Sequence, residues 1–295
     1  MSLTLRSSFY GLILSALILG PALPAAHAQS QASCTFKLFM LNPSGKNLSP
    51  KGINSYDTVV GQASVDQGFT RFSNGGITYY SAPNSASTYF TDRNDNGVDV
   101  GVYSSQSNST LAKGFMLHGP TFTSIVHPKA VLGTTLTGIN KYNTIVGWYL
   151  DANEISHGFK RYSNGSFLNL NYPGAQYTLA TGINDSGTVA GFYADNVGVH
   201  AFIYGNGKWA PVNFGTTNTT QVFGISNANK VVGVSTSNEP STSFLYENGT
   251  FKVIAYPNSF STQVAGIAAN GQITGTIILS SSDPTSGRGF TATCN

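Results

Sequence analysis

The chain has 295 residues, of which 15 are Lys or Arg and 12 are Asp or Glu, so its formal net charge is +3 and only 9% of its residues are charged. An ordinary soluble domain is roughly 25% charged. Together with 33 Gly residues and 12% aromatic residues, this composition excludes a helical bundle, a coiled coil and a charge-rich disordered chain. It is typical of a β-rich protein with many turns.

The first 28 residues have the pattern of a secretory signal peptide. Arg6 is basic, residues 9–20 form an apolar run, and Ala26-His27-Ala28 is a small-x-small cleavage pattern. The run is too short for a confident membrane span, and an uncleaved N-terminal anchor is the alternative. We expect a signal peptide over 1–28, cleaved after Ala28, and a single secreted or periplasmic domain over 29–295 without a membrane span.

Lys and Arg do not cluster anywhere in the mature chain. Because phosphate binding requires a basic stripe, we expect no nucleic-acid partner. We also expect the protein to be a monomer.

An internal repeat of about 40–46 residues occupies the mature chain. Its anchor is Gly-Ile-Asn or a degenerate form of it, and the anchors begin at Gly52, Asp92, Gly138, Gly182, Gly224 and Gly266. A second Gly follows seven residues after each anchor, at Gly61, Gly101, Gly147, Gly191, Gly233 and Gly275. A small residue before a Phe comes next, and in four units an Asn-Gly turn follows, which is a strong hairpin signal.

Each unit reads as four short strands separated by turn residues. In unit four the pattern predicts strands over 177–183, 188–193, 199–204 and 209–214. Four strands in a repeat of this length are typical of a β-propeller blade. We therefore predict an all-β fold, a six-bladed β-propeller with four-stranded blades and no second domain.

The two ends of the mature chain complement each other. The last unit stops at Cys294-Asn295, without its fourth strand, and residues 33–43 have the pattern of that missing strand. The N-terminal strand should therefore complete the C-terminal blade and bring Cys34 opposite Cys294. Because export allows disulfides to persist, we expect a Cys34–Cys294 bond; two free thiols are the alternative.

The units resemble the bacterial HAF-type extracellular repeat family. His200-Ala201-Phe202 and His157-Gly158-Phe159 match its motif, as does the stretch 182–193, and the other units depart at the His. The resemblance covers nearly the whole mature chain. It implies export and a repeat fold, but no established activity, and no catalytic residue can be carried over from it.

One stretch has the spacing of a metal-binding loop. Asp92, Asn94 and Asn96 alternate before Gly97, as in the first half of a calcium loop, and Asp99 is a further candidate ligand. The twelfth position is Tyr103 rather than Glu, which excludes a standard EF-hand. The alternative is the ordinary Asn-rich turn of the repeat, so calcium is the one possible cofactor.

Aromatic and acidic residues recur in neighbouring units. The candidate binding residues are Tyr103, Trp148, Tyr149, Asp151, Tyr193 and Asp195. The aromatic residues could form an arc on one face that suits sugar rings or a protein surface, and ordinary packing is the alternative. The two acids share a repeat slot, but no proton-donor and base pair is evident.

These observations favour an exported, non-catalytic propeller that binds a glycan or protein ligand. The alternative is a carbohydrate-active enzyme, a polysaccharide lyase or hydrolase, with its site at the propeller channel and converging carboxylates. A purely structural envelope protein is a third possibility.

Overall fold

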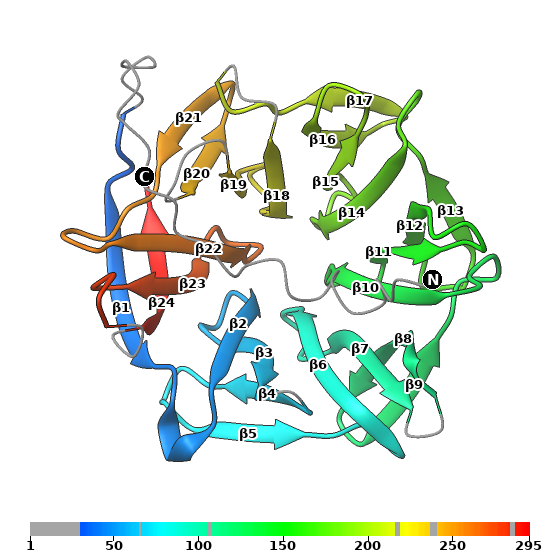
Figure 1. Ribbon diagram of the computed structural model, residues 1–295, viewed down its shortest axis with the longest axis horizontal. Helices are drawn as coiled ribbons and strands as arrows, with labels where there is room; N and C mark the ends of the chain where they lie inside the picture. Colours follow the sequence, from blue (N-terminus) through cyan, green and yellow to red (C-terminus); the bar gives the residue numbers. More distant parts are fainter. Residues whose placement is uncertain (1–29, 65, 106–107, 216–218, 237–240, 284–286) are drawn as a thin grey trace, which may run out of the picture.

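A computed structural model describes residues 30–295 except 65, 106–107, 216–218, 237–240 and 284–286. Its strands are arranged as a ring around a central channel, so the fold is an all-β propeller (Figure 1). One short 3₁₀ helix, Pro43–Gly45, joins the first two strands. Within the described ranges, no helix is long and apolar enough to cross a membrane. The predicted signal peptide, 1–28, lies outside the described residues.

Four of the sheets are separate and have four strands each. The first sheet contains β2 (Leu48–Ile53), β3 (Val59–Ala63), β4 (Gln67–Arg71) and β5 (Ile77–Tyr80). The second contains β14 (Tyr177–Ile183), β15 (Val189–Ala194), β16 (Val199–Gly205) and β17 (Lys208–Pro211). The third contains β18 (Thr220–Ile225), β19 (Val231–Ser235), β20 (Thr242–Glu247) and β21 (Thr250–Val253). The fourth closes the ring with β22 (Ser261–Ile267), β23 (Ile273–Ile278), β24 (Arg288–Cys294) and β1 (Cys34–Met40).

The remaining strands form one eight-stranded sheet. It contains β6 (Ser85–Arg93), β7 (Asp99–Ser105), β8 (Asn108–His118), β9 (Thr121–Ile125), β10 (Gly133–Ile139), β11 (Ile145–Leu150), β12 (Ser156–Arg161) and β13 (Phe167–Leu170).

The prediction of a six-bladed propeller with separate four-stranded blades is therefore wrong: there are four four-stranded sheets, not six. The cause is a parallel pairing of Gly133 in β10 with Ala112 in β8, which joins repeat units two and three. The strand β8 has 11 residues and so reaches the start of β10. A side chain at Gly133 would lie 3.2 Å from the Ala112 carbonyl oxygen, so glycine permits the contact.

The two glycine and phenylalanine markers of the repeat meet in the core. One Phe of each unit is fully buried; the six are Phe69, Phe115, Phe159, Phe202, Phe244 and Phe290. In unit two the ring of Phe115 lies over Gly101, where an added Cβ would be 2.8 Å from the ring. The same contact is present at Gly61, Gly191, Gly233 and Gly275, so in five units the spacing in the sequence corresponds to a direct packing contact inside the sheet.

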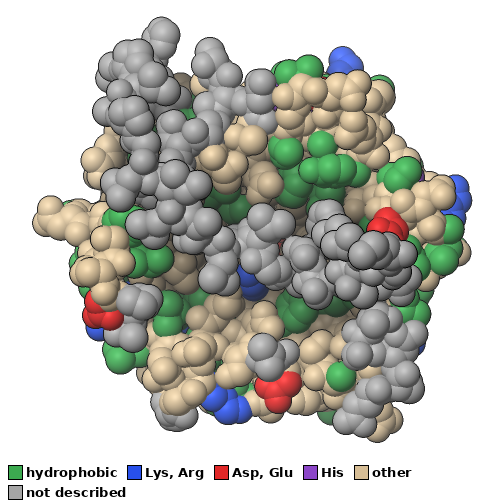
Figure 2. Space-filling model, in the orientation of Figure 1, with side chains coloured by type: hydrophobic (Ala, Val, Ile, Leu, Met, Phe, Trp, Pro, Cys, Tyr) green, Lys and Arg blue, Asp and Glu red, His purple; other side chains and the backbone are tan. Residues whose placement is uncertain are grey.

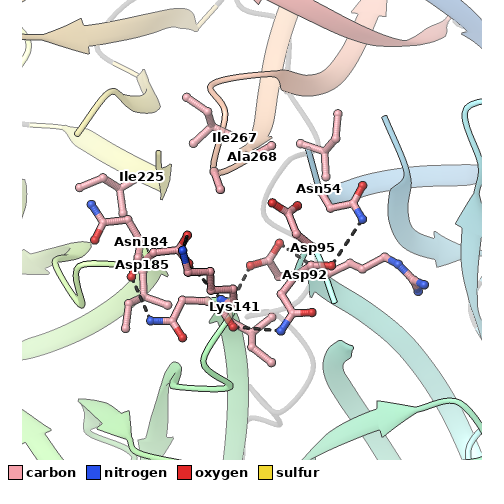
Figure 3. Close-up of a pocket in the computed structure, with 16 residues that line it drawn as sticks. Asn54, Asp92, Asp95, Lys141, Asn184, Asp185, Ile225, Ile267 and Ala268 are labelled. Carbon is pink, nitrogen blue, oxygen red and sulfur yellow. Dashed lines mark hydrogen bonds and ion pairs between the residues drawn. The ribbon is translucent and has the colours of Figure 1, made fainter. Parts of the chain in front are cut away.

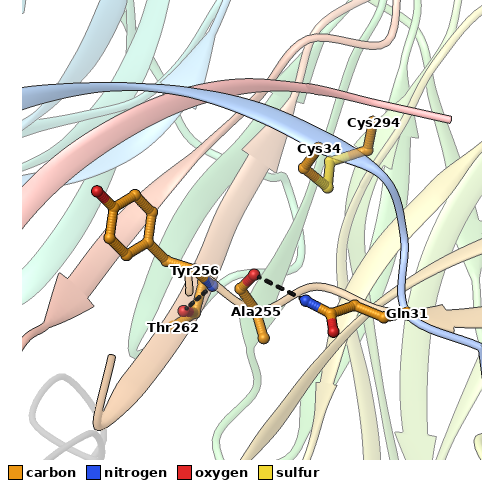
Figure 4. Close-up of a disulfide and its surroundings, with 6 residues drawn as sticks. All are labelled: Gln31, Cys34, Ala255, Tyr256, Thr262 and Cys294. Atoms are coloured by element: carbon orange, nitrogen blue, oxygen red, sulfur yellow. Dashed lines mark hydrogen bonds between the residues drawn. A yellow bond between two sulfur atoms is a disulfide. The ribbon is translucent and has the colours of Figure 1, made fainter. Parts of the chain in front are cut away.

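The ring closes as predicted. The outermost strand β1 pairs antiparallel with β24, and Cys34 lies opposite Cys294 in the register (Figure 1). The two sulfurs form a disulfide with an S–S distance of 2.05 Å (Figure 4). Just before β1 the chain also pairs with the neighbouring sheet, where the Ala32 N–H donates to the Val253 carbonyl at 2.9 Å.

Candidate functional site

The anchors of the repeat form the rim of the central channel. Wherever a turn joins the third and fourth strands of a unit, it lies at the same end of the ring as the turn after the inner strand. We call this end the turn face, and the opposite end, where linkers join successive units, the linker face. The anchors Gly-Ile-Asn end the inner strands β2, β6, β10, β14, β18 and β22 on the turn face.

The anchor asparagines form a hydrogen-bonded belt around part of this rim. In each case the side-chain oxygen accepts main-chain N–H groups of its own turn, as Asn54 does from Tyr56 and Thr58, both at 3.1 Å. The side-chain amide instead donates to the next unit. The donations run from Asn54 to the Asn94 carbonyl, from Asn94 to Asn140, from Asn140 to Asn184 and from Asn184 to Ser226, at 3.4, 2.9, 3.0 and 3.1 Å.

A second set of bonds ties the turns together one residue further out (Figure 3). The Ser55 N–H donates to the Asp95 carboxylate at 2.8 Å, and the Lys141 N–H donates to the Asp185 carboxylate at 3.0 Å. The Lys141 ammonium also pairs with Asp185 at 3.4 Å. The turns therefore form a fixed polar rim rather than independent loops.

Below the rim the inner strands touch backbone to backbone. The anchor glycine permits this: a Cβ at Gly182 would lie 2.6 Å from the Cα of Gly224. Asp92 occupies this slot in β6. One oxygen of its carboxylate accepts the Arg93 N–H at 2.9 Å, and the other accepts the Ile139 N–H of β10 at 3.0 Å.

Asp92 is the most perturbed acid of the channel. Burial, helped by the nearby carboxylates of Asp99 and Asp95, raises its pKa to about 7 against the opposing effect of the two main-chain hydrogen bonds. A carboxyl group with this pKa exchanges protons near neutral pH, as an acid-base group must.

The channel itself is narrow. A mouth cavity of about 30 Å³ lies inside the rim, lined by Asp92, Asp95, Lys141 and Asp185 among others, and an inner cavity of about 20 Å³ lies deeper (Figure 3). Such volumes hold one or two ordered water molecules, not a sugar ring. Asp92 lines both cavities.

The predicted calcium ligands Asp92, Asn94, Asn96 and Asp99 are not brought together as one set. Asp92 and Asn94 line the mouth cavity. The Asn94 oxygen accepts the N–H groups of Asn96 and Val98, and the Asn96 amide donates to the Lys141 carbonyl. Across the described ranges, no group of three or more His, Cys, Asp or Glu side chains could hold a metal ion.

Asp99 faces a different partner. Arg93 donates to both of its carboxylate oxygens, at 2.9 and 2.7 Å. Burial raises the pKa of Asp99 to about 6 despite this ion pair. The alternating pattern at 92–97 therefore builds the Asn-rich turn of the repeat and an internal ion pair.

The predicted aromatic residues lie at the other end of the second strands, toward the linker face. Tyr103 and Tyr149 are 8% and 3% exposed, so they are core residues. The Tyr103 hydroxyl bonds Ser124 at 2.9 Å. Tyr193 is stacked on Tyr172 with a centroid distance of 3.7 Å. Trp148 is partly buried, and in the sheet it is paired with Thr135 and Gly158.

The two predicted acids, Asp151 and Asp195, each bind a histidine of their own unit. Asp151 contacts His157 Nε2 at 3.0 Å and Asp195 contacts His200 Nε2 at 3.3 Å. Each carboxylate also accepts two N–H groups of its own turn. Neither acid lines either cavity, so the structure does not bring the two together as a catalytic pair.

Sequence reasoning did not identify the exposed aromatic residues of the rim as a site. Tyr56 and Tyr142 follow the anchors of units one and three and are 65% and 59% exposed. They flank the turn of unit two, whose Asp95 and Asn96 bond Ser55 and Lys141 on either side. The signal was the recurrence of Tyr two residues after Gly-Ile-Asn, next to polar turn residues.

The molecular surface has few charges. In Figure 2 few Lys, Arg, Asp and Glu side chains are in view. Uncharged side chains therefore make up most of the described surface in this view.

Comparisons with known proteins give the fold and no family. No protein-family model and no curated protein sequence matches the chain. Among solved structures, a streptogramin B lyase is 12% identical over 88% of this chain and 98% of its own, with a TM-score of 0.52. A PQQ-bound aldose sugar dehydrogenase from Streptomyces coelicolor is 11% identical over 90% and 100%, with a TM-score of 0.54. A TolB structure from Agrobacterium tumefaciens is 9% identical over 76% and 89%, with a TM-score of 0.57. At these identities the similarity is one of fold alone, and the chain is a β-propeller by its architecture.

Proposed function

We propose that the protein is an exported, non-catalytic binding module of the HAF type that recognises glycans on its turn face. The observation that carries the proposal is the pair of exposed rings, Tyr56 and Tyr142, mounted on turns that hydrogen bonds hold in place. A tyrosine ring stacks on the apolar face of a sugar, and neighbouring amides and carboxylates form hydrogen bonds with the hydroxyl groups of the sugar. Asp95 and Asn96 supply such groups between the two rings.

The disulfide supports export. Cys34 and Cys294 are joined across the ring closure, and such bonds persist in oxidising compartments outside the cytosol. The apolar run at the N-terminus, together with its cleavage pattern, points in the same direction.

The narrow channel favours binding over catalysis. A lyase or hydrolase acting at the channel needs a cleft for the sugar and two groups within hydrogen-bond reach of it. The cavities of about 30 and 20 Å³ admit no sugar ring. The surface acids Asp151 and Asp195 are committed to histidines and turn N–H groups.

The test is a glycan array probed with the mature protein, followed by titration of any ligand found. We expect binding that Tyr56→Ala and Tyr142→Ala each weaken at least tenfold. Phe260→Ala is the matched control, because Phe260 is an exposed aromatic residue, at 42%, in the linker between β21 and β22. If the control loses as much affinity as the two tyrosine variants, the turn face is not the binding surface.

The same glycans separate the leading proposal from the two alternatives. Release of new reducing ends or unsaturated products would establish a carbohydrate-active enzyme and overturn the non-catalytic proposal. If no glycan binds but a protein is retained through Tyr56 and Tyr142, the surface is correct and the ligand class is wrong.

A further inference from the structure

Every inner strand contains a one-residue bulge at the same place. The register of β2 shifts between Pro50 and Gly52, and the other five inner strands shift at the equivalent position. The extra residue is left out of the pairing, and bulges of this kind redirect a side chain. Five of these extra residues line the inner cavity: Lys51, Thr91, Thr137, Thr181 and Phe223.

Lys51 is the one charged residue among these five. The threonine hydroxyls are already used within the ring, since Thr91 donates to the Leu136 carbonyl at 2.8 Å and Thr137 donates to the Ala180 carbonyl at 2.7 Å. Lys51 is partly buried, and no described residue forms a hydrogen bond or an ion pair with its ammonium group. Burial accordingly lowers the pKa of Lys51 below its ordinary value.

The acid that shares this cavity does not neutralise the lysine. Both carboxylate oxygens of Asp92 accept main-chain N–H groups. With respect to the described part of the chain, the ammonium group is therefore a charge without a partner inside the channel, which is costly unless a counter-ion joins it.

We propose that the inner cavity is a binding site for one small anion, held by the Lys51 ammonium group. The volume of about 20 Å³ limits the occupant to a halide or a carboxylate group. A free anion and the carboxylate of a larger ligand reaching into the channel share this chemistry. The site is separate from the tyrosine pair of the turn face and does not depend on the glycan proposal.

The test is thermal unfolding of the mature protein in increasing sodium formate. The ionic strength is held constant with a bulky sulfonate salt that cannot enter the cavity. We expect a saturable rise in Tm for the natural protein and for Lys51→Arg, and none for Lys51→Met. Lys141→Met is the matched control, since Lys141 lies at the channel mouth with Asp185 as its partner, and its formate response should match that of the natural protein.

Glucuronate separates the two sources of the anion. A site for free anions responds to formate and not to glucuronate, whereas a site for the carboxylate of a larger ligand responds to both. Either result supports the site, provided that Lys51→Met abolishes the response.

A second measurement covers the case in which Lys51→Met does not fold. In the natural protein with ¹³C-methylated lysines, formate should shift one lysine resonance saturably and raise its apparent pKa, and Lys51→Arg should remove that resonance. A formate response that is absent from the natural protein, or that persists unchanged in Lys51→Met, overturns the proposal.

Discussion

The closing sheet and the continuous sheet β14–β17 reach the same geometry by different covalent routes. In the continuous sheet, β16 and β17 are joined by the hairpin Asn206-Gly207, both residues having positive φ angles of 52° and 74°. In the closing sheet, β24 and β1 are the two ends of the chain, and Cys34 lies opposite Cys294 where the hairpin would be. A disulfide replaces the turn.

Despite this difference, the buried phenylalanine of the third strand packs against an aromatic ring of the fourth strand in both sheets. Phe202 and Phe290 are both fully buried in their third strands. Phe202 contacts Trp209 of β17, and Phe290 contacts Phe36 of β1, with centroid distances of 4.8 and 5.2 Å. The comparison teaches that the repeat specifies packing between strands, while the link between the third and fourth strands can be exchanged.

Removal of the disulfide should give the largest effect in this comparison. The bond spans 260 residues, so in the chain-entropy model its loss lowers the free energy of unfolding by up to about 5 kcal/mol. The measurement is urea unfolding of Cys34→Ser/Cys294→Ser against the oxidised protein. An unchanged midpoint would mean that strand pairing alone closes the ring.

Truncation of the two buried phenylalanines should give the second-largest loss in the free energy of unfolding. Phe202→Ala and Phe290→Ala should each cost about 3–5 kcal/mol, because each leaves a cavity in an equally packed sheet. In the cysteine-free protein the cost of Phe290→Ala should fall, since Phe36 is then held less firmly, while that of Phe202→Ala should not change. Equal costs in both backgrounds would show that the disulfide does not support this packing.

The part of the fold that sequence could predict is the part set by this repeated packing. Gly101 and its equivalents repeat because an added Cβ would lie about 2 Å from a carbonyl oxygen of the inner strand, and in five of the six units it would also clash with the ring of the buried phenylalanine. The matching of the two chain ends predicted the pairing of β1 with β24 and the Cys34–Cys294 bond, and both are confirmed. The glycine and phenylalanine positions recur because each unit needs them, and the closing strand is recognisable because it has the pattern of the fourth strand of the other units.

The remainder depends on contacts that occur once. The merging of two units into one sheet rests on a single pairing of Gly133 with Ala112, which no repeat pattern encodes. Tyr103 and Tyr149 recur as an exposed binding arc would, but the structure buries them, because periodicity does not separate packing from exposure. The substitution of Asp92 for glycine was visible in the sequence, but its partner Ile139 was not.

The eight-stranded sheet differs from the continuous and closing sheets at the anchor glycine of its first inner strand, β6, where Asp92 takes the place of glycine. The folded-state pKa of Asp92, about 7, is above its ordinary value of 3.8, so the fold favours the protonated form. This group therefore lowers stability as the pH rises from about 4 to about 7, by up to about 1.4 kcal/mol per pH unit, and adds no further slope above that range.

Asp92→Gly, which restores the residue of the other units, should remove this slope. The measurement is urea unfolding at pH 4, 5.5 and 7.5, read as the difference between the variant and the natural protein. Asp99 contributes a slope of the same sign up to about pH 6 and stays in both proteins, so it cancels in the difference. A difference that does not vary with pH would show that Asp92 is ionised throughout.

Alanine in place of the anchor glycine of the continuous and closing sheets should lower the free energy of unfolding by a smaller amount, similar in the two sheets. A Cβ at Gly182 would lie 2.6 Å from the Cα of Gly224, and one at Gly266 would lie 2.6 Å from the Lys51 carbonyl oxygen. Gly182→Ala and Gly266→Ala should each cost about 1–3 kcal/mol through overpacking. Gly205→Ala is the control, because its nearest neighbour is the Thr188 hydroxyl at 3.3 Å. If Gly266→Ala lowers the free energy of unfolding less than Gly182→Ala does, the inner strand of the closing sheet adjusts more easily to the added methyl group.

The smallest effect concerns a pair that only the continuous sheet has. Asp195 binds His200 there, whereas Leu279 and Arg288 occupy these slots in the closing sheet. Main-chain N–H donation from Val197, with further bonds from Gly198 and His200, holds the pKa of Asp195 below its ordinary value. Its contribution to stability is therefore present above about pH 4 and is lost as the pH falls through the folded-state pKa.

Asp195→Asn should lower the unfolding midpoint slightly at pH 7 and by less at pH 3, because the amide oxygen still accepts the turn N–H groups and the variant lacks only the charge, which the natural carboxylate itself loses as the pH falls. Asp151→Asn should behave in the same way, since Asp151 and His157 form the equivalent pair in unit three. The measurement is thermal unfolding of both variants at the two pH values. A loss at pH 3 as large as that at pH 7 would assign the contribution to the turn itself, and the continuous and closing sheets would then differ in backbone rather than in charge.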